Sequence, residues 1–282
     1  MPSLRNGITA LAVILSLNFS LAASAQAAAK LPVVATFSIL ADFVQNIGGD
    51  HVEITALVGP NGDTHVYQPK PTDAQRLAAA RLIIKNGLGL EGWIDRLIKA
   101  SGARAPVIIA SKGINPQQMR EEGSTELDPH AWQSIADAKI YVANIRDGLI
   151  AADPGAEAAY RANAGDYLRK LSLLEKEVQA EIAKIPPERR RIITTHDAFG
   201  YFGTAYGFRF IAPEGVSTET EASARDVAKI IRQIKAQKIP AVFLENVTNP
   251  RLVQNIAAES GAKIGGTLYS DALSPPGGPA PT

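Results

Sequence analysis

The chain of 282 residues is 46% hydrophobic and 20% charged, a composition typical of a globular protein with a sizeable core. Its 29 basic and 28 acidic residues give a net charge of +1, which offers no basic field to nucleic acid or acidic membranes. Cysteine is absent, which excludes disulfides, thiolate zinc sites, iron–sulfur clusters and blue copper, so a metal site must use nitrogen and oxygen ligands.

The N-terminal segment predicts export. Arg5 is followed by an apolar stretch from Ile8 to Leu21, and then by Ala23-Ser24-Ala25, the small-x-small pattern that a signal peptidase accepts. The stretch is too short for a transmembrane helix, so we interpret residues 1–25 as a cleaved signal peptide. Because no cysteine follows it to carry a lipid anchor, we expect a free periplasmic protein of a Gram-negative bacterium.

The first half of the mature chain alternates strands with helices. Apolar runs and helical spacing predict strands over Leu31–Thr36, Val52–Val58, Leu82–Ile84 and Val107–Ala110, and helices over Phe37–Ile47, Thr72–Ala80, Gly92–Ala100 and Ile135–Ile150. The loop Gly59–His65 is dense in turn-forming residues. This order predicts an α/β lobe with a parallel sheet and helices on both faces.

The second half repeats this plan. A shift of about 159 residues places Thr36 on Thr195, and a shift of about 160 places Leu82–Ile84 on Val242–Leu244. The matching order and spacing of elements predict a duplicated α/β lobe. Ile192–Phe202 predicts a buried strand that ends at His196 and turns into a helix.

A helix is expected between the two halves. From Pro154 to Ile185, apolar residues recur at helical spacing among charges of both signs, and Pro186-Pro187 ends the pattern. At 1.5 Å per residue such a helix is on the order of 40 Å long. We therefore expect an N-terminal α/β lobe over residues 26–153, a rigid linking helix over 154–185 and a C-terminal α/β lobe over 186–282.

Three of the four histidines, His65, His130 and His196, lie in polar segments that follow separate strands, and Asp271 ends another short apolar run. The intervals between them are about 65, 66 and 75 residues, which matches no local metal motif. Two facing lobes would place such loops around one cleft, where three imidazoles and a carboxylate can bind a metal ion. His51 lies in a surface turn and is left out.

Other interpretations stay open at this point. A single histidine is more often an ordinary polar turn residue than a ligand, and only the joint pattern favours a site. A periplasmic zinc hydrolase would need an open coordination position and a base, for which Asp197 or Glu245 is a candidate. Either residue is equally a partner that orients a ligand, and Glu245 is also a candidate for a helix cap or ion pair. A surface adhesin or structural metal protein is a third class. No nucleophile elbow or phosphate loop is present.

Five segments carry a resemblance to a known family. They are Gly62–Pro69, Asp128–Trp132, Thr195–Phe202, Val216–Glu221 and Tyr269–Ser274. Together they resemble the zinc/manganese solute-binding proteins of bacterial ABC importers, the cluster A-I class, from about Leu31 to Ser274. The resemblance implies two α/β lobes joined by one long helix, with the metal between them bound by His65, His130, His196 and Asp271. It implies a carrier, not an enzyme.

The resemblance also implies the cargo and the partners. A histidine at position 196 favours zinc, whereas a glutamate there is common in manganese carriers, and imidazole suits zinc better than manganese. Manganese remains the alternative, because Ser111–Leu127 lacks the histidine-rich loop of many zinc carriers. The expected partners are an ABC permease with its ATPase and a metallochaperone. The protein itself is expected to be a monomer. Since the family has a helix beyond the aspartate loop, we expect a truncated C-terminal lobe after Ala272.

Overall fold

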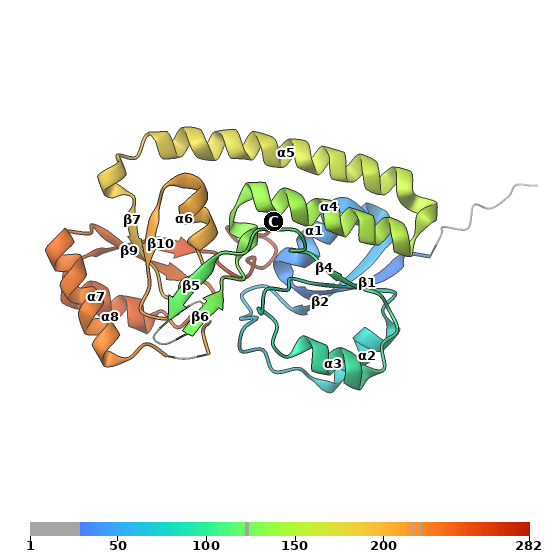
Figure 1. Ribbon diagram of the computed structural model, residues 1–282, viewed down its shortest axis with the longest axis horizontal. Coiled ribbons are helices and arrows are strands. Elements are labelled where there is room, and N and C mark those ends of the chain that lie inside the picture. Colours follow the sequence, from blue (N-terminus) through green and yellow to red (C-terminus); the bar gives the residue numbers. More distant parts are fainter. Residues whose placement is uncertain (1–28, 122–123, 216, 220) are drawn as a thin grey trace, which may run out of the picture.

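The structure is a computed structural model that describes residues 29–121, 124–215, 217–219 and 221–282. The signal peptide expected over residues 1–25 lies outside the described residues. Two parallel four-stranded sheets lie next to each other, and one long helix runs across both (Figure 1).

The first sheet has the strand order β2-β1-β3-β4, with every neighbouring pair parallel. Its strands are β1 (Leu31–Phe37), β2 (Val52–Val58), β3 (Leu82–Lys85) and β4 (Val107–Ile109). The helices of this half are α1 (Ser38–Gly48), α2 (Pro71–Ala79), α3 (Ile94–Ser101) and α4 (Ile135–Ala152). The central strands β1 and β3 bury Val33, Ile83 and Ile84, as expected of parallel strands covered on both faces.

The second sheet has the order β10-β9-β7-β8 and is also parallel. Its strands are β7 (Arg191–Ile193), β8 (Arg209–Ile211), β9 (Ala241–Glu245) and β10 (Lys263–Leu268). The helices of this half are α6 (Gly200–Tyr206), α7 (Ala224–Gln237) and α8 (Arg251–Ser260). When the four sheet strands of each half are numbered in chain order, both sheets have the spatial order second, first, third, fourth. This shared order agrees with the predicted internal repeat. The predicted fold class, two mainly parallel sheets flanked by helices and joined by a long helix, is confirmed.

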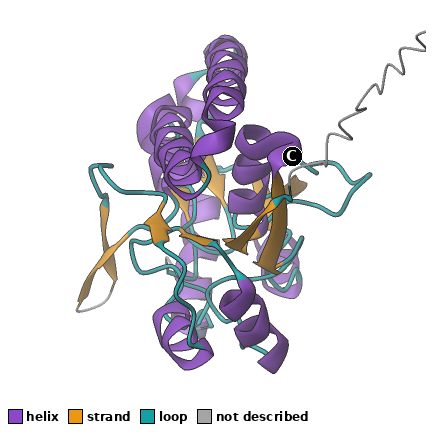
Figure 2. Cartoon of the chain, turned by 90° about the vertical axis from the view of Figure 1, so that its right-hand side faces the viewer, coloured by secondary structure: helices purple, strands orange, loops and turns teal. Residues whose placement is uncertain are grey.

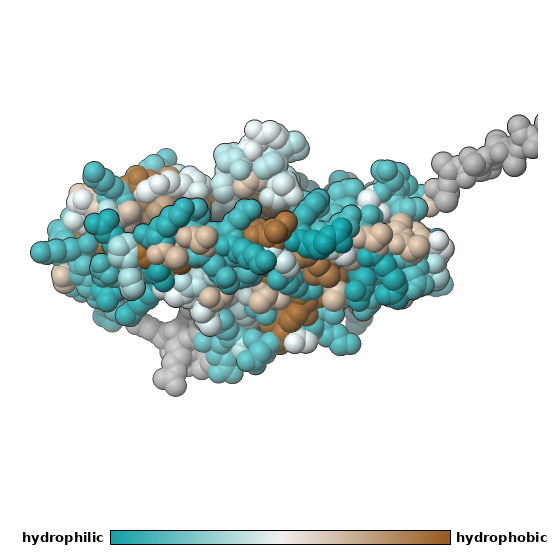
Figure 3. Space-filling model, turned by 90° about the horizontal axis from the view of Figure 1, so that it is seen from above, coloured by the Kyte–Doolittle hydropathy of each residue, from teal (hydrophilic) through white to brown (hydrophobic). Residues whose placement is uncertain are grey.

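The long helix α5 covers Glu157–Ala183, 27 residues, and is preceded by a 3-10 turn over Pro154–Ala156. It is shorter at both ends than the predicted span 154–185. At its end the N–H of Ile185 bonds to the carbonyl of Ile182, the tighter i−3 pattern, just before the two prolines. Seen from above, the molecule shows mostly hydrophilic side chains, with hydrophobic ones in scattered patches (Figure 3). Among the described residues, no helix is both long and apolar enough to cross a membrane.

A β-hairpin that the sequence did not reveal projects from the body of the molecule (Figure 2). It consists of the antiparallel strands β5 (Gln118–Glu121) and β6 (Ser124–Leu127). The hairpin lies between β4 and α4 in the chain. It therefore leads directly into the segment that carries His130.

The two halves are in direct contact beneath α5. Tyr201 of α6 belongs to the hydrophobic core of the first half, and its hydroxyl accepts a hydrogen bond from the N–H of Gln117 at 3.0 Å. The C-terminal segment also reaches across, because the N–H of Leu273 donates to Ser38 Oγ and its carbonyl accepts from Asn61. These contacts place the carboxyl ends of both sheets against each other.

Candidate metal centre

His65 and His130 are held by the same local device. In each case the backbone N–H of the histidine donates to a carboxylate two residues earlier: Asp63 Oδ1 for His65 and Asp128 Oδ1 for His130, both at 2.9 Å. Such aspartate turns fix a short loop without regular secondary structure. Asp128 Oδ1 also lies 2.8 Å from His130 Nδ1, so it orients the imidazole as well as the backbone.

His196 is held from a neighbouring strand. The prediction that it ends its strand is wrong by three residues, because β7 stops at Ile193. Glu245, the last residue of β9, explains the difference: its Oε1 accepts the N–H groups of Thr195 at 2.7 Å and His196 at 3.0 Å, in place of sheet partners. Glu245 Oε2 lies 2.7 Å from His196 Nδ1, a close contact whose alignment falls short of a hydrogen bond.

Asp271 follows β10 and is positioned from the other half of the chain. The carbonyl oxygen of the preceding residue, Ser270, accepts hydrogen bonds from Trp132 Nε1 at 3.0 Å and Gln133 Nε2 at 2.8 Å. The two donors lie two and three residues after His130 in the sequence. The loop that carries one predicted ligand is therefore bonded to the loop that carries another.

The structure brings all four predicted site residues together. One ligand atom from each of His65, His130, His196 and Asp271 lies within 4.8 Å of the other three. The Nε2 atoms of His65 and His130 are 3.2 Å apart, and Asp271 Oδ2 is 3.3 Å from His65 Nε2 and 3.2 Å from His196 Nε2. Zinc–nitrogen bonds of about 2.0–2.1 Å in a tetrahedron place neighbouring ligand atoms about 3.3–3.4 Å apart, so the spacing suits a single small cation.

The cluster is buried, and several polar atoms of His196 and Asp271 lack protein hydrogen bonds. His130, His196 and Asp271 are fully buried, and His65 is 8% exposed. Among the described residues, His196 Nε2 and both carboxylate oxygens of Asp271 have no hydrogen-bond partner. Burying such groups unpaired is costly, and a cation bound between them would remove that cost.

Carboxylates near the imidazoles of His130 and His196 stabilise the protonated forms of these two rings. Burial opposes the imidazolium of His130, but Asp271 and Asp128 outweigh it and raise the pKa of His130 to about 9. The pKa of His196 also lies well above its usual range, because Glu245 and Asp271 outweigh burial. In turn His196 and His130 outweigh the burial of Asp271 and hold its pKa well below normal. The carboxylates that favour the protonated rings of His130 and His196 would equally favour a divalent cation between them.

The other candidates from the sequence lie differently. His51 is exposed and packs edge-on against the ring of Tyr160, away from the cluster. The backbone N–H of Asp197 donates to the carbonyl of Gly215. The roles of Asp63 and Asp128 were missed, although the repeated Asp-x-His spacing at positions 63–65 and 128–130 is a signal for them.

The chain is similar to known metal-binding proteins over most of its length. The family model described as zinc-uptake complex component A, periplasmic, matches residues 33–282. The iron-binding protein YfeA of Yersinia pestis is 35% identical over 256 residues, which cover 90% of this chain and 82% of that protein. The manganese ABC transporter substrate-binding lipoprotein PsaA of Streptococcus pneumoniae is 31% identical over 255 residues, which cover 88% and 82%.

A solved structure supports the same relationship. The periplasmic zinc-binding protein TroA of Treponema pallidum matches with a TM-score of 0.84 at 33% identity, over 89% of this chain and 92% of that chain. The resemblance to metal-binding components of ABC importers is thereby confirmed. The chain belongs to the family of zinc-uptake complex component A, whose members are substrate-binding components of metal transporters and not enzymes.

Proposed function

We propose that the protein captures a divalent metal ion, with zinc preferred, and delivers it to an ABC importer. The proposed ligands are His65, His130, His196 and Asp271. The observation that carries the proposal is the convergence of four buried ligand atoms whose closest separations are 3.2–3.5 Å. Four protein ligands would fill a tetrahedral shell and leave no position for a reacting water, which suits a carrier and not a hydrolase.

Zinc is the preferred cargo because of the donor set. Three imidazoles dominate the cluster, and imidazole suits zinc, whereas manganese prefers oxygen. Zinc also lies above manganese in the intrinsic order of affinity for such ligands. Asp128 and Glu245 beside the rings of His130 and His196 would raise the basicity of both ligands and strengthen binding.

Manganese is the second candidate, and one observation favours it. Both oxygens of Asp271 face the cluster, with Oδ1 3.5 Å from His130 Nε2 and Oδ2 3.2 Å from His196 Nε2. If Asp271 bound the ion through both oxygens, the coordination number would exceed four. The site would then have two oxygen ligands, which manganese prefers. The relative PsaA is named for manganese, and YfeA is named for iron.

The proposal extends to the organisation of the chain, its location and its partners. We propose a signal peptide over residues 1–25, an N-terminal lobe over 26–153, the linking helix over 154–185 and a C-terminal lobe over 186–282. The mature protein would act free in the periplasm, because the sequence has no cysteine to carry a lipid, in contrast to the lipoprotein PsaA. Its partners would be the membrane permease with its ATPase and a metallochaperone, and it would act as a monomer.

Elemental analysis tests the proposal most directly. The protein is purified from the periplasm without chelator, and its zinc, manganese and iron contents are measured per chain. We expect close to one equivalent of metal, mainly zinc, and tighter binding of zinc than of manganese in a competition titration. A tighter manganese complex would favour the second candidate, and a protein that binds neither ion would reject the proposed function.

A further inference from the structure

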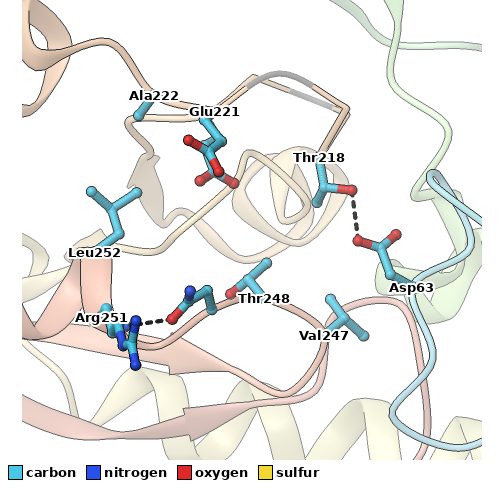
Figure 4. A pocket seen from close by; sticks show the side chains of 10 residues that line it. Asp63, Thr218, Glu221, Ala222, Val247, Thr248, Arg251 and Leu252 are labelled. Carbon is cyan, nitrogen blue, oxygen red and sulfur yellow. Dashed lines mark hydrogen bonds between the residues drawn. The ribbon is translucent and has the colours of Figure 1, made fainter.

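A hydrogen bond crosses between the two halves beside His65. The hydroxyl of Thr218 donates to Asp63 Oδ2 at 2.7 Å, and these residues are 155 positions apart in the chain. Figure 4 shows the two side chains pointing toward each other across the edge of a hollow. The other oxygen of the same carboxylate, Oδ1, accepts the backbone N–H of His65. Asp63 therefore connects the position of His65 to a segment of the opposite half.

Asp63 differs in this respect from the other two carboxylates that hold a histidine. Asp128 and Glu245 each accept the backbone N–H of their histidine and also lie within 2.8 Å of its ring nitrogen Nδ1. Those carboxylates act on the imidazole itself. The second oxygen of Asp63 turns instead to Thr218, so the support of His65 depends on the other half of the molecule.

His65 is also the predicted ligand that borders solvent. It is 8% exposed, whereas His130, His196 and Asp271 are fully buried. It lines a hollow of about 640 Å³ together with Ser217 and Glu219. A cation that leaves the cluster along the exposed side therefore passes His65.

The segment 217–219 separates this hollow from a second one. Ser217 and Glu219 line the hollow that His65 borders, while Thr218 and Asp63 line the other, of about 310 Å³. The Thr218–Asp63 hydrogen bond thus lies between the two openings beside the cluster. Breaking it would remove a side-chain hydrogen bond that joins the segment to the loop of His65.

We infer that the hydrogen bond from Thr218 to Asp63 positions His65 over the bound ion and slows release of the ion past His65. The inference rests on the proposed function. Asp63 and Thr218 are positioning residues, since neither is a predicted ligand. A hydrogen bond to a carboxylate is among the stronger ones in proteins, so its loss is expected to speed release by on the order of tenfold.

Stopped-flow release of zinc into excess chelator tests the inference. Thr218→Val keeps the shape of the side chain and removes the hydroxyl, whereas Thr218→Ser keeps the hydroxyl. We expect the dissociation rate of zinc to rise about tenfold in Thr218→Val and to stay within about twofold of wild type in Thr218→Ser. Equal rates in wild type and Thr218→Val, or equal increases in both variants, would overturn the inference.

A matched control is available in Thr204. Its hydroxyl also donates between the halves, to Gln117 Oε1 at 3.1 Å, but on α6 and not at Asp63. Thr204→Val is therefore expected to release zinc at the wild-type rate. A tenfold increase there as well would assign the effect to loosened contact between the halves and overturn the role of Thr218.

A double-mutant cycle covers the case in which one variant alters packing. If the two residues act through one hydrogen bond, Asp63→Asn and Thr218→Val together should speed release by less than the product of their separate effects. Independent, multiplying effects would contradict the inference. Failure of wild type to bind zinc or manganese would instead reject the proposed function, so the two outcomes are distinguishable.

Discussion

The indole N–H of Trp132 lies 3.0 Å from the carbonyl oxygen of Ser270 and donates a hydrogen bond to it. This contact joins the loop after His130 to the residue before Asp271, across the boundary between the halves. The loops of His130 and Asp271 are thus held in place by a hydrogen bond within the protein that requires no bound ion. Preorganisation of this kind lowers the entropic cost of binding, so we expect small local rearrangements on binding instead of wide closure of the halves.

Removing one proposed ligand should abolish tight binding. His196→Ala is expected to weaken zinc affinity by on the order of a hundredfold or more, because even partners of metal ligands commonly contribute ten- to a hundredfold. His51→Ala is the matched control, since His51 is exposed and lies outside the cluster. Competition titration with a zinc indicator measures both. Similar losses in the two variants would mean that the ligand set is wrong.

Loading with metal should release at least one proton at pH 7.5. The pKa of His130, about 9, keeps its ring protonated in the metal-free protein, the pKa of His196 is raised as well, and metal binding requires the neutral form of each ring. Calorimetry in buffers of different ionisation enthalpy counts the protons. Three ordinary imidazoles would release only about 0.3 protons at this pH. A value that low would show that the carboxylates do not raise these pKa values.

The stability of the metal-free protein should fall with rising pH. A histidine whose folded-state pKa is raised stabilises the folded state fully below its unfolded pKa, and loses that contribution as pH rises through the folded value. For His130 this window runs from about 6.5 to about 9. Metal affinity rises over the same window because protons compete less. The increase in melting temperature caused by zinc should therefore be larger at pH 8.5 than at pH 6, and an equal increase would contradict the assignment.

The carboxylate of Glu245 should matter for zinc affinity although it is not a proposed ligand. Glu245→Gln keeps its size but weakens its support of the His196 ring and of two backbone N–H groups. We expect a ten- to hundredfold loss of zinc affinity, as for other partners of metal ligands. Glu259→Gln, at an exposed position of α8, should leave the affinity unchanged. Identical affinities in all three proteins would exclude this role.

Gly200 should be intolerant of a side chain. A Cβ atom at this position would collide with Asp128 Oδ2, which reaches the start of α6 from the other half. The displaced carboxylate would release the ring and backbone of His130, so Gly200→Ala is expected to lower zinc affinity at least tenfold. Gly165→Ala, where the added carbon meets only a distant Arg169 side chain, should instead raise stability by about 0.5–1 kcal/mol. Wild-type zinc affinity in Gly200→Ala would refute the argument.

The sequence predicted those elements that periodicity specifies. The strands at Leu31 and Val52, and the helix α5, have strong patterns, and their limits lie within a few residues of the prediction. The strand at Val52 and the helix α5 are also followed by glycine or proline, at Gly59-Pro60 and Pro186-Pro187. The ends of β7 could not be predicted, because Glu245 replaces sheet hydrogen bonds from 49 residues away. The β5–β6 hairpin is too polar to show an apolar strand pattern.

Three of the proposed ligands, His65, His196 and Asp271, each follow a strand of a parallel sheet in a polar turn, and parallel strands bring such turns to one edge. His130 instead follows the antiparallel strand β6, and its predicted place at the site came from its polar Asp-Pro-His segment. The partners of the ligands were harder to find. Asp63 and Asp128 share a local spacing that indicates an aspartate turn, but Thr218 reaches Asp63 only through the packing of the two halves. No pattern in the sequence links residues 155 positions apart. In the proposed site, the preference between zinc and manganese would depend on whether Asp271 binds through one oxygen or two, which residue identity does not specify.

The dispersal of the four proposed ligands along the chain bears on when an ion could be acquired. His65 and His130 precede α5, whereas His196 and Asp271 follow it, so no single stretch of unfolded polypeptide holds more than one of them within about 60 residues. A nascent or translocating chain would therefore retain zinc only weakly. Under the proposed function, the ion would be held tightly only after both halves have docked, and a molecule that fails to fold would sequester little of it.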